Sequence, residues 1–84
     1  MARDWADRDR FLALLRETRR RKGVTQVELA ARLGQHQSFV SKYETGERRL
    51  DFLEVREICG ALQVSFPGFV RRYEALTEAD TAGR

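Results

Sequence analysis

Polar side chains that can form hydrogen bonds outward are grouped near the middle of the chain, at Gln37, Ser38, Ser41 and Lys42. At about 100° per residue these four cover one arc of roughly 140° on a helix. The opposite side of the same helix carries Phe39, Val40 and Tyr43. A helix with this apolar back can pack onto a scaffold while its amide, hydroxyl and ammonium groups face outward. Such a front suits base edges and phosphates in a DNA major groove.

The residues before this helix have the spacing of two helices that cross steeply at a tight turn. Ala30 is small enough for the closest approach of the helices. Gly34 tolerates the positive φ that the turn requires. Val40 is placed to fill the angle between the helices. Together, this spacing between Gln26 and Glu44 predicts a helix-turn-helix unit.

The bulk composition fits one small domain. The chain has 84 residues, of which 42% are hydrophobic, and we expect its core over residues 8–76, with flexible ends at residues 1–6 and 77–84. No apolar run reaches the roughly 18 residues of a membrane span, and the charged N-terminus is unlike a signal peptide. A single cysteine excludes an internal disulfide and fits a reducing compartment. We therefore expect a cytoplasmic, nucleoid-associated protein that makes no contact with a membrane.

The net charge of +3 is concentrated toward the N-terminus. Residues 1–22 carry +4, residues 23–50 carry +1 and residues 51–84 carry −2. The positive part suggests a polyanionic partner there and makes the C-terminal tail a poor contact surface for it. Solvated surface charge explains the same numbers, so composition alone gives nucleic acid only a small advantage as the partner.

Every segment predicts helix or short turn, so the fold class is all-α, a compact bundle of about five short helices. Thr25 with Glu28, and Asp51 with Glu54, form two capping boxes that each mark a helix N-terminus. The expected helices run from about Asp7 to Lys22, from the Thr25 cap to the Gly34 turn, from Gln37 to Glu44, from the Asp51 cap through Leu62, and from after Ser65 to about Leu76.

Apolar residues at helical spacing indicate the buried faces. The expected core residues are Phe11, Leu12, Leu15 and Thr18 on the first helix, and Phe52, Val55, Ile58, Cys59 and Leu62 on the fourth. The fifth helix carries more apolar surface than its length needs, which predicts a dimer surface at Phe66, Phe69, Val70 and Tyr73. We expect Trp5 to cover an edge of the core and Gly60 to mark a close contact between helices.

Enzymatic chemistry has little support in the sequence. One histidine, His36, and one cysteine, Cys59, are too few for a metal site of ordinary ligand count. No glycine-rich phosphate loop and no paired carboxylates occur in the sequence. We therefore expect no catalytic residue, no metal and no cofactor, and we expect Cys59 to be an inert core residue.

Two segments, TQVELAARLG and QSFVSKYETGERRLD, resemble the Cro and lambda-repressor type of helix-turn-helix protein. The resemblance covers roughly Leu15 to Leu62 and is strongest in the second segment, which is similar to small bacterial transcriptional regulators. It implies a lambda-repressor-like bundle in which the second and third helices form the DNA-binding unit. Members of this family usually bind palindromic operators as dimers.

The resemblance also implies roles for individual residues. The base-contacting positions of the family match Gln37, Ser38, Ser41 and Lys42. Arg19 and Glu44 match an arginine and a glutamate that pair between the first and third helices. Gln26 matches a glutamine that anchors a phosphate, and its place in the first turn of a helix independently favours that role. Arg48 and Arg49 match the loop that meets the DNA backbone in the family. Two further cations expected to hold phosphates, Arg19 and Arg20, belong to the run of four cations that ends the first helix, which is more than its C-terminus needs.

Two roles stay open, and four positions depart from the family pattern. Lys42 can reach either a base or a phosphate, and Phe39 is either a packed edge residue or a contact for a thymine methyl group. Thr18 stands where a leucine is usual, Gln35 replaces an apolar residue after the turn, His36 replaces a capping serine or threonine, and Gln63 replaces a glycine.

Two functional hypotheses follow. The first is a sequence-specific, double-stranded DNA-binding transcriptional regulator, a repressor that acts as a homodimer on a palindromic operator. The alternative is a protein-interaction module, antitoxin-like or adaptor-like, that docks a partner protein through the fifth helix. The first predicts DNA binding that weakens steeply with salt, whereas the second predicts co-purification of a protein and weak DNA affinity.

Overall fold

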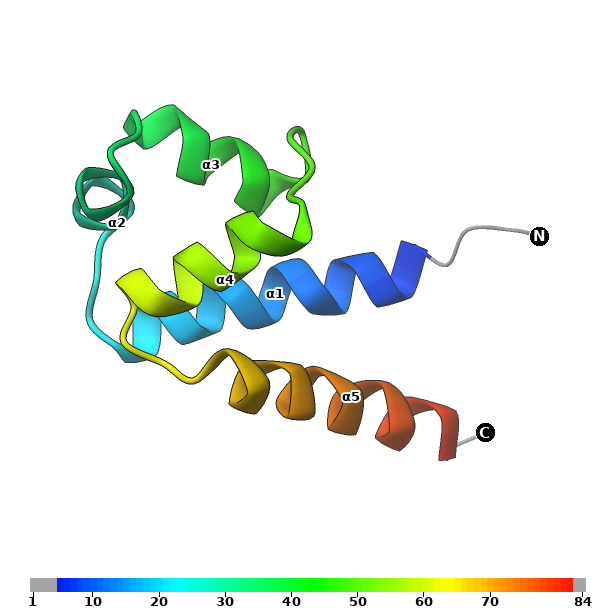
Figure 1. Cartoon of the computed structure of the whole chain (residues 1–84). Coiled ribbons are helices and arrows are strands. Elements are labelled where there is room, and N and C mark those ends of the chain that lie inside the picture. Colours follow the sequence, from blue (N-terminus) through cyan, green and yellow to red (C-terminus); the bar gives the residue numbers. More distant parts are fainter. Residues whose placement is uncertain (1–4, 83–84) are drawn as a thin grey trace.

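In the computed structural model the described residues, 5–82, form five helices and no strand, and side chains are described for residues 6–79. The helices are α1 (Trp5–Arg21), α2 (Gln26–Leu33), α3 (Gln37–Thr45), α4 (Phe52–Ala61) and α5 (Phe66–Ala82), as Figure 1 shows. The all-α bundle predicted from the sequence is confirmed. Within this part of the chain, no helix is both long enough and apolar enough to cross a membrane.

The helices are stacked so that α3 and α5 lie on opposite sides of the bundle, with α1 and α4 between them (Figure 1). α1 packs against both α3 and α5, and α2 packs against both α3 and α4. α4 completes the arrangement by packing on α5. Each outer helix therefore has one side against the bundle and one side toward solvent.

All five helices and the segment after α1 contribute to a single apolar core, whose buried members are Leu12, Leu14, Leu15, Val24, Leu29, Ala30, Val40, Tyr43, Val55, Ile58, Cys59, Leu62 and Phe69. Burial raises the pKa of the Cys59 thiol, which disfavours the reactive thiolate. The expected place of Phe52 in this core is wrong, because its side chain is 69% exposed. Phe52 is the first residue of α4, and its ring packs edge-on against Phe66 with 5.0 Å between centroids.

Both predicted capping boxes are formed. The Thr25 hydroxyl accepts from the Glu28 N–H at 3.0 Å, and the Glu28 carboxylate accepts from the Thr25 N–H at 2.9 Å. Asp51 and Glu54 make the same reciprocal pair at 2.8 and 2.9 Å. α3 has no such start, because the side chain of its N-cap residue, His36, makes no capping hydrogen bond. The position of α3 therefore depends on tertiary contacts.

Four turns of the described chain use the left-handed backbone region, the first at Gly23, after α1, with φ 69°. Gly34 ends α2 at φ 67° and Gly46 ends α3 at φ 87°. Gln63, which stands where the family favours glycine, adopts φ 58° after α4. Gly60 lies inside α4, and apart from its chain neighbours and the backbone of its own helix, no heavy atom lies within 4 Å of the Cβ that a larger residue would carry there. The expected close helix contact at Gly60 is therefore wrong.

The helix ends differ from the sequence prediction at both ends of the chain. α1 begins at Trp5, two residues earlier than expected, and α5 continues to Ala82 instead of ending near Leu76. Residues 1–4 and 83–84 of the predicted flexible ends lie outside the described residues. The predicted cover of the core by Trp5 also lies outside the described side chains.

The left-handed turns give a reciprocal test of backbone strain. We expect Gly34→Gln to lower the free energy of unfolding by about 1 kcal/mol, because a Cβ disfavours positive φ. Gln63→Gly should raise it by up to about 1 kcal/mol for the same reason, less the entropy that glycine adds to the unfolded chain. Urea denaturation of the two variants measures both changes. Changes of the same sign would contradict this explanation.

Candidate nucleic-acid interface

α3 is buried on one side and open on the other. Its underside carries Val40 and Tyr43, which are fully buried. Phe39, next to them, is half-buried and packs edge-on against Tyr43 with 5.6 Å between centroids. The four predicted base-contacting residues all lie on the other side, where three of them are exposed and the fourth, Ser41, is half-buried: Gln37, Ser38, Ser41 and Lys42. We call these four residues the polar face of α3.

Thr45 extends this face, and the sequence analysis missed it. It is exposed and lies one turn after Ser41, and its hydroxyl donates to the Lys42 carbonyl at 3.1 Å. Its spacing from Ser38 and Ser41 was a sufficient signal. It was missed because α3 was expected to end at Glu44, one residue too early.

A buried ion pair fixes α3 to α1. The Nε of Arg19 lies 2.7 Å from one carboxylate oxygen of Glu44, and Nη2 lies 3.1 Å from the other. Nη1 of Arg19 donates to the Val24 carbonyl at 2.8 Å, which also ties the segment before α2 to the pair. Arg19 is 7% exposed and Glu44 is 8% exposed. The predicted Arg19–Glu44 pair is confirmed. The hydrogen bonds to Glu44 raise the pKa of the Arg19 guanidinium, which favours its charged form.

These contacts rule out the second role predicted for Arg19. A phosphate ligand must reach solvent, whereas the Arg19 guanidinium is enclosed and donates to Glu44 and Val24 from all three of its nitrogens. Releasing it would leave the Glu44 carboxylate buried without its counter-charge, which is costly. The prediction that Arg19 holds a DNA phosphate is therefore wrong.

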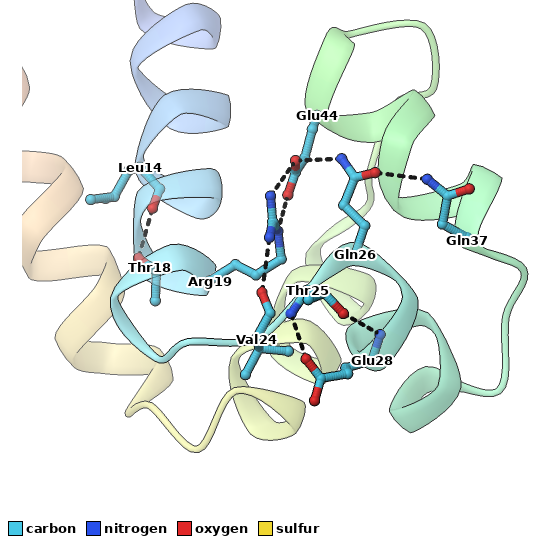
Figure 2. A network of polar contacts seen from close by, with 9 residues as sticks. All are labelled: Leu14, Thr18, Arg19, Val24, Thr25, Gln26, Glu28, Gln37 and Glu44. Atoms are coloured by element: carbon cyan, nitrogen blue, oxygen red, sulfur yellow. Dashed lines mark hydrogen bonds and ion pairs between the residues drawn. The ribbon is translucent and has the colours of Figure 1, made fainter.

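The ion pair continues outward through two glutamines. Nε2 of Gln26 donates to Oε1 of Glu44 at 3.0 Å, and Nε2 of Gln37 donates to Oε1 of Gln26 at 2.8 Å. Figure 2 shows the resulting chain, Arg19–Glu44–Gln26–Gln37, which joins α1, α3 and α2 and then returns to the start of α3. The first two side chains are buried, Gln26 is half-buried and Gln37 is exposed. The polar face of α3 is thus connected to the interior at Gln37.

The remaining predicted phosphate ligands lie at the surface. Arg20 on α1 and Arg49 after α3 are exposed. Arg48 makes two hydrogen bonds to the Glu54 carboxylate, at 3.1 and 2.8 Å, and its guanidinium carbon lies 4.6 Å from the centroid of the Phe39 ring. Phe39 therefore packs at the edge of the core beneath Arg48, and its contact with a thymine methyl group stays a prediction.

The C-terminal end of α3 has an anchor that the sequence did not reveal. Arg8 on α1 donates from Nη2 to the Gly46 carbonyl at 2.7 Å. A cation at this position also complements the negative end of the helix dipole of α3. Arg8 is 38 residues away from Gly46 along the chain, and nothing in its local sequence distinguishes it from the other arginines of α1.

The four residues of the predicted dimer surface on α5 do not all lie at the surface, because one of them belongs to the core. Phe69 is only 5% exposed and packs edge-on against Phe11, with 6.3 Å between centroids, so its assignment to a dimer surface is wrong. Val70 is 41% exposed, and Phe66 and Tyr73 are half-buried. Together with α4 they border an apolar groove of about 190 Å³, lined by Phe11, Phe52, Val55, Phe66, Phe69, Val70 and Tyr73.

The polar face offers amide, hydroxyl and ammonium groups on a rigidly held helix. These groups can exchange hydrogen bonds with base edges and phosphates. Among the described residues, no group of three or more histidine, cysteine, aspartate or glutamate side chains could hold a metal ion.

Comparison with known proteins agrees with this geometry. Residues 15–69, from α1 to the first turn of α5, match the helix-turn-helix family. The chain belongs to the XRE, or lambda-repressor-like, helix-turn-helix family. A solved structure of an XRE-family like protein from Pseudomonas syringae pv. tomato str. DC3000 is 46% identical, with a TM-score of 0.81 over 86% of this chain and 88% of that chain. No curated protein matches the sequence significantly. As a member of the XRE family, the chain is a DNA-binding regulator.

Removing one partner of the buried ion pair should be far more damaging than neutralising both. We expect Arg19→Met to lower the free energy of unfolding by about 3–5 kcal/mol, because it leaves the Glu44 carboxylate buried without a counter-charge. The double variant Arg19→Met/Glu44→Gln should recover most of this loss. Urea denaturation at neutral pH measures both, and a double variant as unstable as the single one would contradict this account.

The Arg48–Glu54 pair predicts a measurable pH dependence. The Arg48 guanidinium, and then the Asp51 N–H, lower the pKa of the Glu54 carboxyl below its ordinary value of 4.5. The pair therefore stabilises the fold above pH 4.5, and this contribution is lost as the pH falls through the lowered pKa. We expect Glu54→Gln to be less stable than the natural protein at pH 7, with the difference shrinking toward pH 3. Thermal unfolding across this range measures the difference, and a difference independent of pH would contradict the assignment.

Proposed function

We propose that this XRE-family regulator is a repressor that binds a palindromic operator as a homodimer. In this proposal α3 enters the major groove, and its polar face, residues 37, 38, 41 and 42, contacts bases. The single observation that supports it most is the division of α3 into a fully buried underside and an outward polar face. That division is what a helix needs if it is to be held firmly by its own protein and still reach base edges.

Phosphates flanking the groove are held by Gln26, Arg20, Arg48 and Arg49 in this proposal. Arg20 and Arg49 are exposed and can reach a phosphate without breaking a contact given by the structure. Arg48 must exchange its two hydrogen bonds to Glu54, and it is the more exposed partner of the pair, with 42% of its side chain exposed against 26% for Glu54. A phosphate can also accept two hydrogen bonds from one guanidinium. Arg48 would therefore form as many charged hydrogen bonds to the phosphate as it gives up to Glu54.

A second copy of the chain is the proposed occupant of the apolar groove between α4 and α5. Phe52 and Val70, at its border, are 69% and 41% exposed, and burying them in a dimer removes apolar surface from water. Two protomers related by a twofold axis place two copies of α3 at half-sites about one helical turn apart. A dimer seated there blocks a promoter by occupying it, at the nucleoid in the cytoplasm.

The same groove supports the alternative function, an adaptor that docks a different protein. Sedimentation equilibrium of the purified chain separates the two. Self-association that is lost on Val70→Glu supports the homodimer, whereas a chain that stays monomeric at every concentration supports the adaptor. Val70→Glu introduces a charge at an exposed position of α5, and we do not expect it to disturb the core.

Substitutions in the polar face and substitutions of the phosphate ligands should have different effects, the first on sequence preference and the second on overall affinity. We expect Ser38→Ala/Lys42→Ala to abolish the preference for the operator over random duplex without a change in the unfolding temperature. Arg49→Gln should instead weaken binding to all sequences and reduce the slope of log affinity against log salt by about 1. Gel-shift titrations at several salt concentrations measure both effects.

Arg71→Gln is the matched control for Arg49→Gln. It makes the same change in net charge on an exposed residue of α5, on the side of the bundle opposite α3 (Figure 1). We expect it to change neither the operator preference nor the salt slope appreciably. Equal effects of Arg49→Gln and Arg71→Gln would contradict a localised phosphate contact and leave only a general effect of charge.

A further inference from the structure

We propose that the groove between α1 and α5 binds an acidic amphipathic helix of a partner protein. On α5 this groove is lined by residues 72, 75 and 76, and it shares no residue with the apolar groove beside α4. Its chemistry also differs, because its apolar floor lies between arginines. The inference goes beyond DNA binding, and it does not depend on which molecule occupies the groove beside α4.

The floor of the groove is apolar. The groove has a volume of about 370 Å³, and the apolar residues that line it are Ala13, Leu14, Ala75 and Leu76. Leu14 belongs to the core and is 4% exposed, whereas Leu76 is 44% exposed. Ala13 on α1 and Ala75 on α5 are both exposed, and their small side chains allow a third helix to approach closely. The groove can therefore receive a row of apolar side chains from another helix.

Arginines surround this floor. Arg10 on α1 and Arg72 on α5 line the groove together with Glu17. A second hollow of about 380 Å³ continues the groove across α1 and shares Ala13 and Glu17 with it. The arginines that line this second hollow are Arg16, Arg20 and Arg21. The combined surface thus carries five arginines and one glutamate in its lining.

The carboxylates at this surface do not neutralise it. Arg10 lies 2.6 Å from Asp7, and Glu17 lies 3.2 Å from Arg72 and 3.3 Å from Arg21. Two carboxylates therefore face five arginines. The side chains of Arg72 and Arg21 are 43% and 67% exposed, and ion pairs this exposed contribute little to stability. A carboxylate of a partner can take over either arginine at little cost.

Charge and shape together select the occupant. The excess of positive charge favours an anionic partner, but a nucleic-acid backbone has no apolar group to place against Leu76 and the alanines. A helix with an apolar stripe and acidic flanks meets both requirements, because the stripe fills the groove and the carboxylates reach the arginines beside it. Residues 10–21 of α1 follow this surface over about 16 Å, which corresponds to about three turns of the partner helix.

The position of the groove allows two partners to be held at once. α5 lies on the side of the bundle opposite α3, as Figure 1 shows, so a helix seated between α1 and α5 leaves the polar face of α3 open. Arg20 is the one residue of this surface that also belongs to the proposed phosphate contacts. A partner that uses the other four arginines can therefore be carried to the operator by the DNA-bound chain.

A synthetic probe tests the groove directly. The probe is a fluorescein-labelled, stapled helix of about four turns, with leucines on one stripe and glutamates on both flanks. Fluorescence polarisation with the full chain should give a Kd in the micromolar range that weakens as salt is added. A helix with lysine in place of every glutamate should bind at least about tenfold more weakly. A helix with serine in place of every leucine should lose binding to the same extent.

Paired variants separate this groove from the rest of the surface. Arg72→Glu and Leu76→Glu should each weaken binding of the acidic helix by about tenfold or more. Arg71→Glu is the matched control for Arg72→Glu, because it makes the same change at an exposed neighbour that lines neither hollow. Val70→Glu is the control for Leu76→Glu, because Val70 is exposed but lines the groove beside α4. Both controls should stay within about twofold of the natural chain.

Chemical shifts of the labelled chain locate the bound helix. We expect the largest changes on residues 10–17 and 72–76. Changes concentrated on residues 52, 66 and 70 would overturn the inference, because the helix would then occupy the groove beside α4. The inference also fails if the lysine helix binds as tightly as the acidic one, or if the acidic helix does not bind at millimolar concentration.

Two further comparisons decide between this partner and the other roles of the chain. Self-association that is lost on Leu76→Glu but kept on Val70→Glu would overturn the inference, because a second copy would then occupy the groove. A chain that binds its operator but not the acidic helix contradicts this inference alone. A chain that binds the acidic helix but enriches no DNA sequence contradicts the proposed function alone.

Discussion

The charged hydrogen bonds between Arg19 and Glu44 are the constraint on which the arrangement of the helices depends. Two ionised groups in the interior of an 84-residue domain are tolerated only if their hydrogen-bonding capacity is met within the protein. That requirement brings α1, the segment before α2, and α3 to one point, because Arg19 also donates to the Val24 carbonyl. Any large shift of α3 relative to α1 would leave an unpaired charge in the core.

α3 depends on such tertiary contacts because it is weak on its own. It has nine residues and no side-chain cap at its N-terminus, and a helix this short does not persist in isolation. The structure supplies three polar anchors: Gln37 to Gln26 at the start, Glu44 to Arg19 in the last turn, and the Gly46 carbonyl to Arg8 at the end. With its underside buried as well, α3 needs little ordering on binding, which reduces the entropic cost of association.

Much of the fold could be predicted because its signals are local. A capping box is determined by four consecutive residues, and the turn at Gly34 by one residue that tolerates positive φ. The polar face of α3 follows from helical periodicity alone. Gln63 shows the limit of local rules. It adopts the left-handed conformation although it is not a glycine, and the only sign of this in the sequence is that the family usually has a glycine there.

The sequence predictions were wrong where the burial of a residue depends on which other element packs against its helix. Periodicity places Phe66, Phe69 and Val70 on or near one stripe of α5, but it cannot say that Phe11 covers Phe69 while Val70 stays in solvent. Phe52 belongs to the apolar stripe of α4 by spacing, yet it lies where α4 begins and the core has ended. Arg19 was expected to serve a phosphate because it belongs to a run of cations at a helix end. Only the position of Glu44 in three dimensions shows that this one cation points inward.

The central claim is that the outward side of α3 is the surface that meets DNA. Amide and side-chain chemical shifts, measured by NMR as an operator-like duplex is added to the labelled chain, test it most directly. The account predicts that the largest changes fall on residues 37–45 and on the side-chain amides of Gln26 and Gln37, with small changes on α5 beyond residue 70. Changes concentrated on α5 or on the outer side of α1, with the polar face of α3 unaffected, would contradict it.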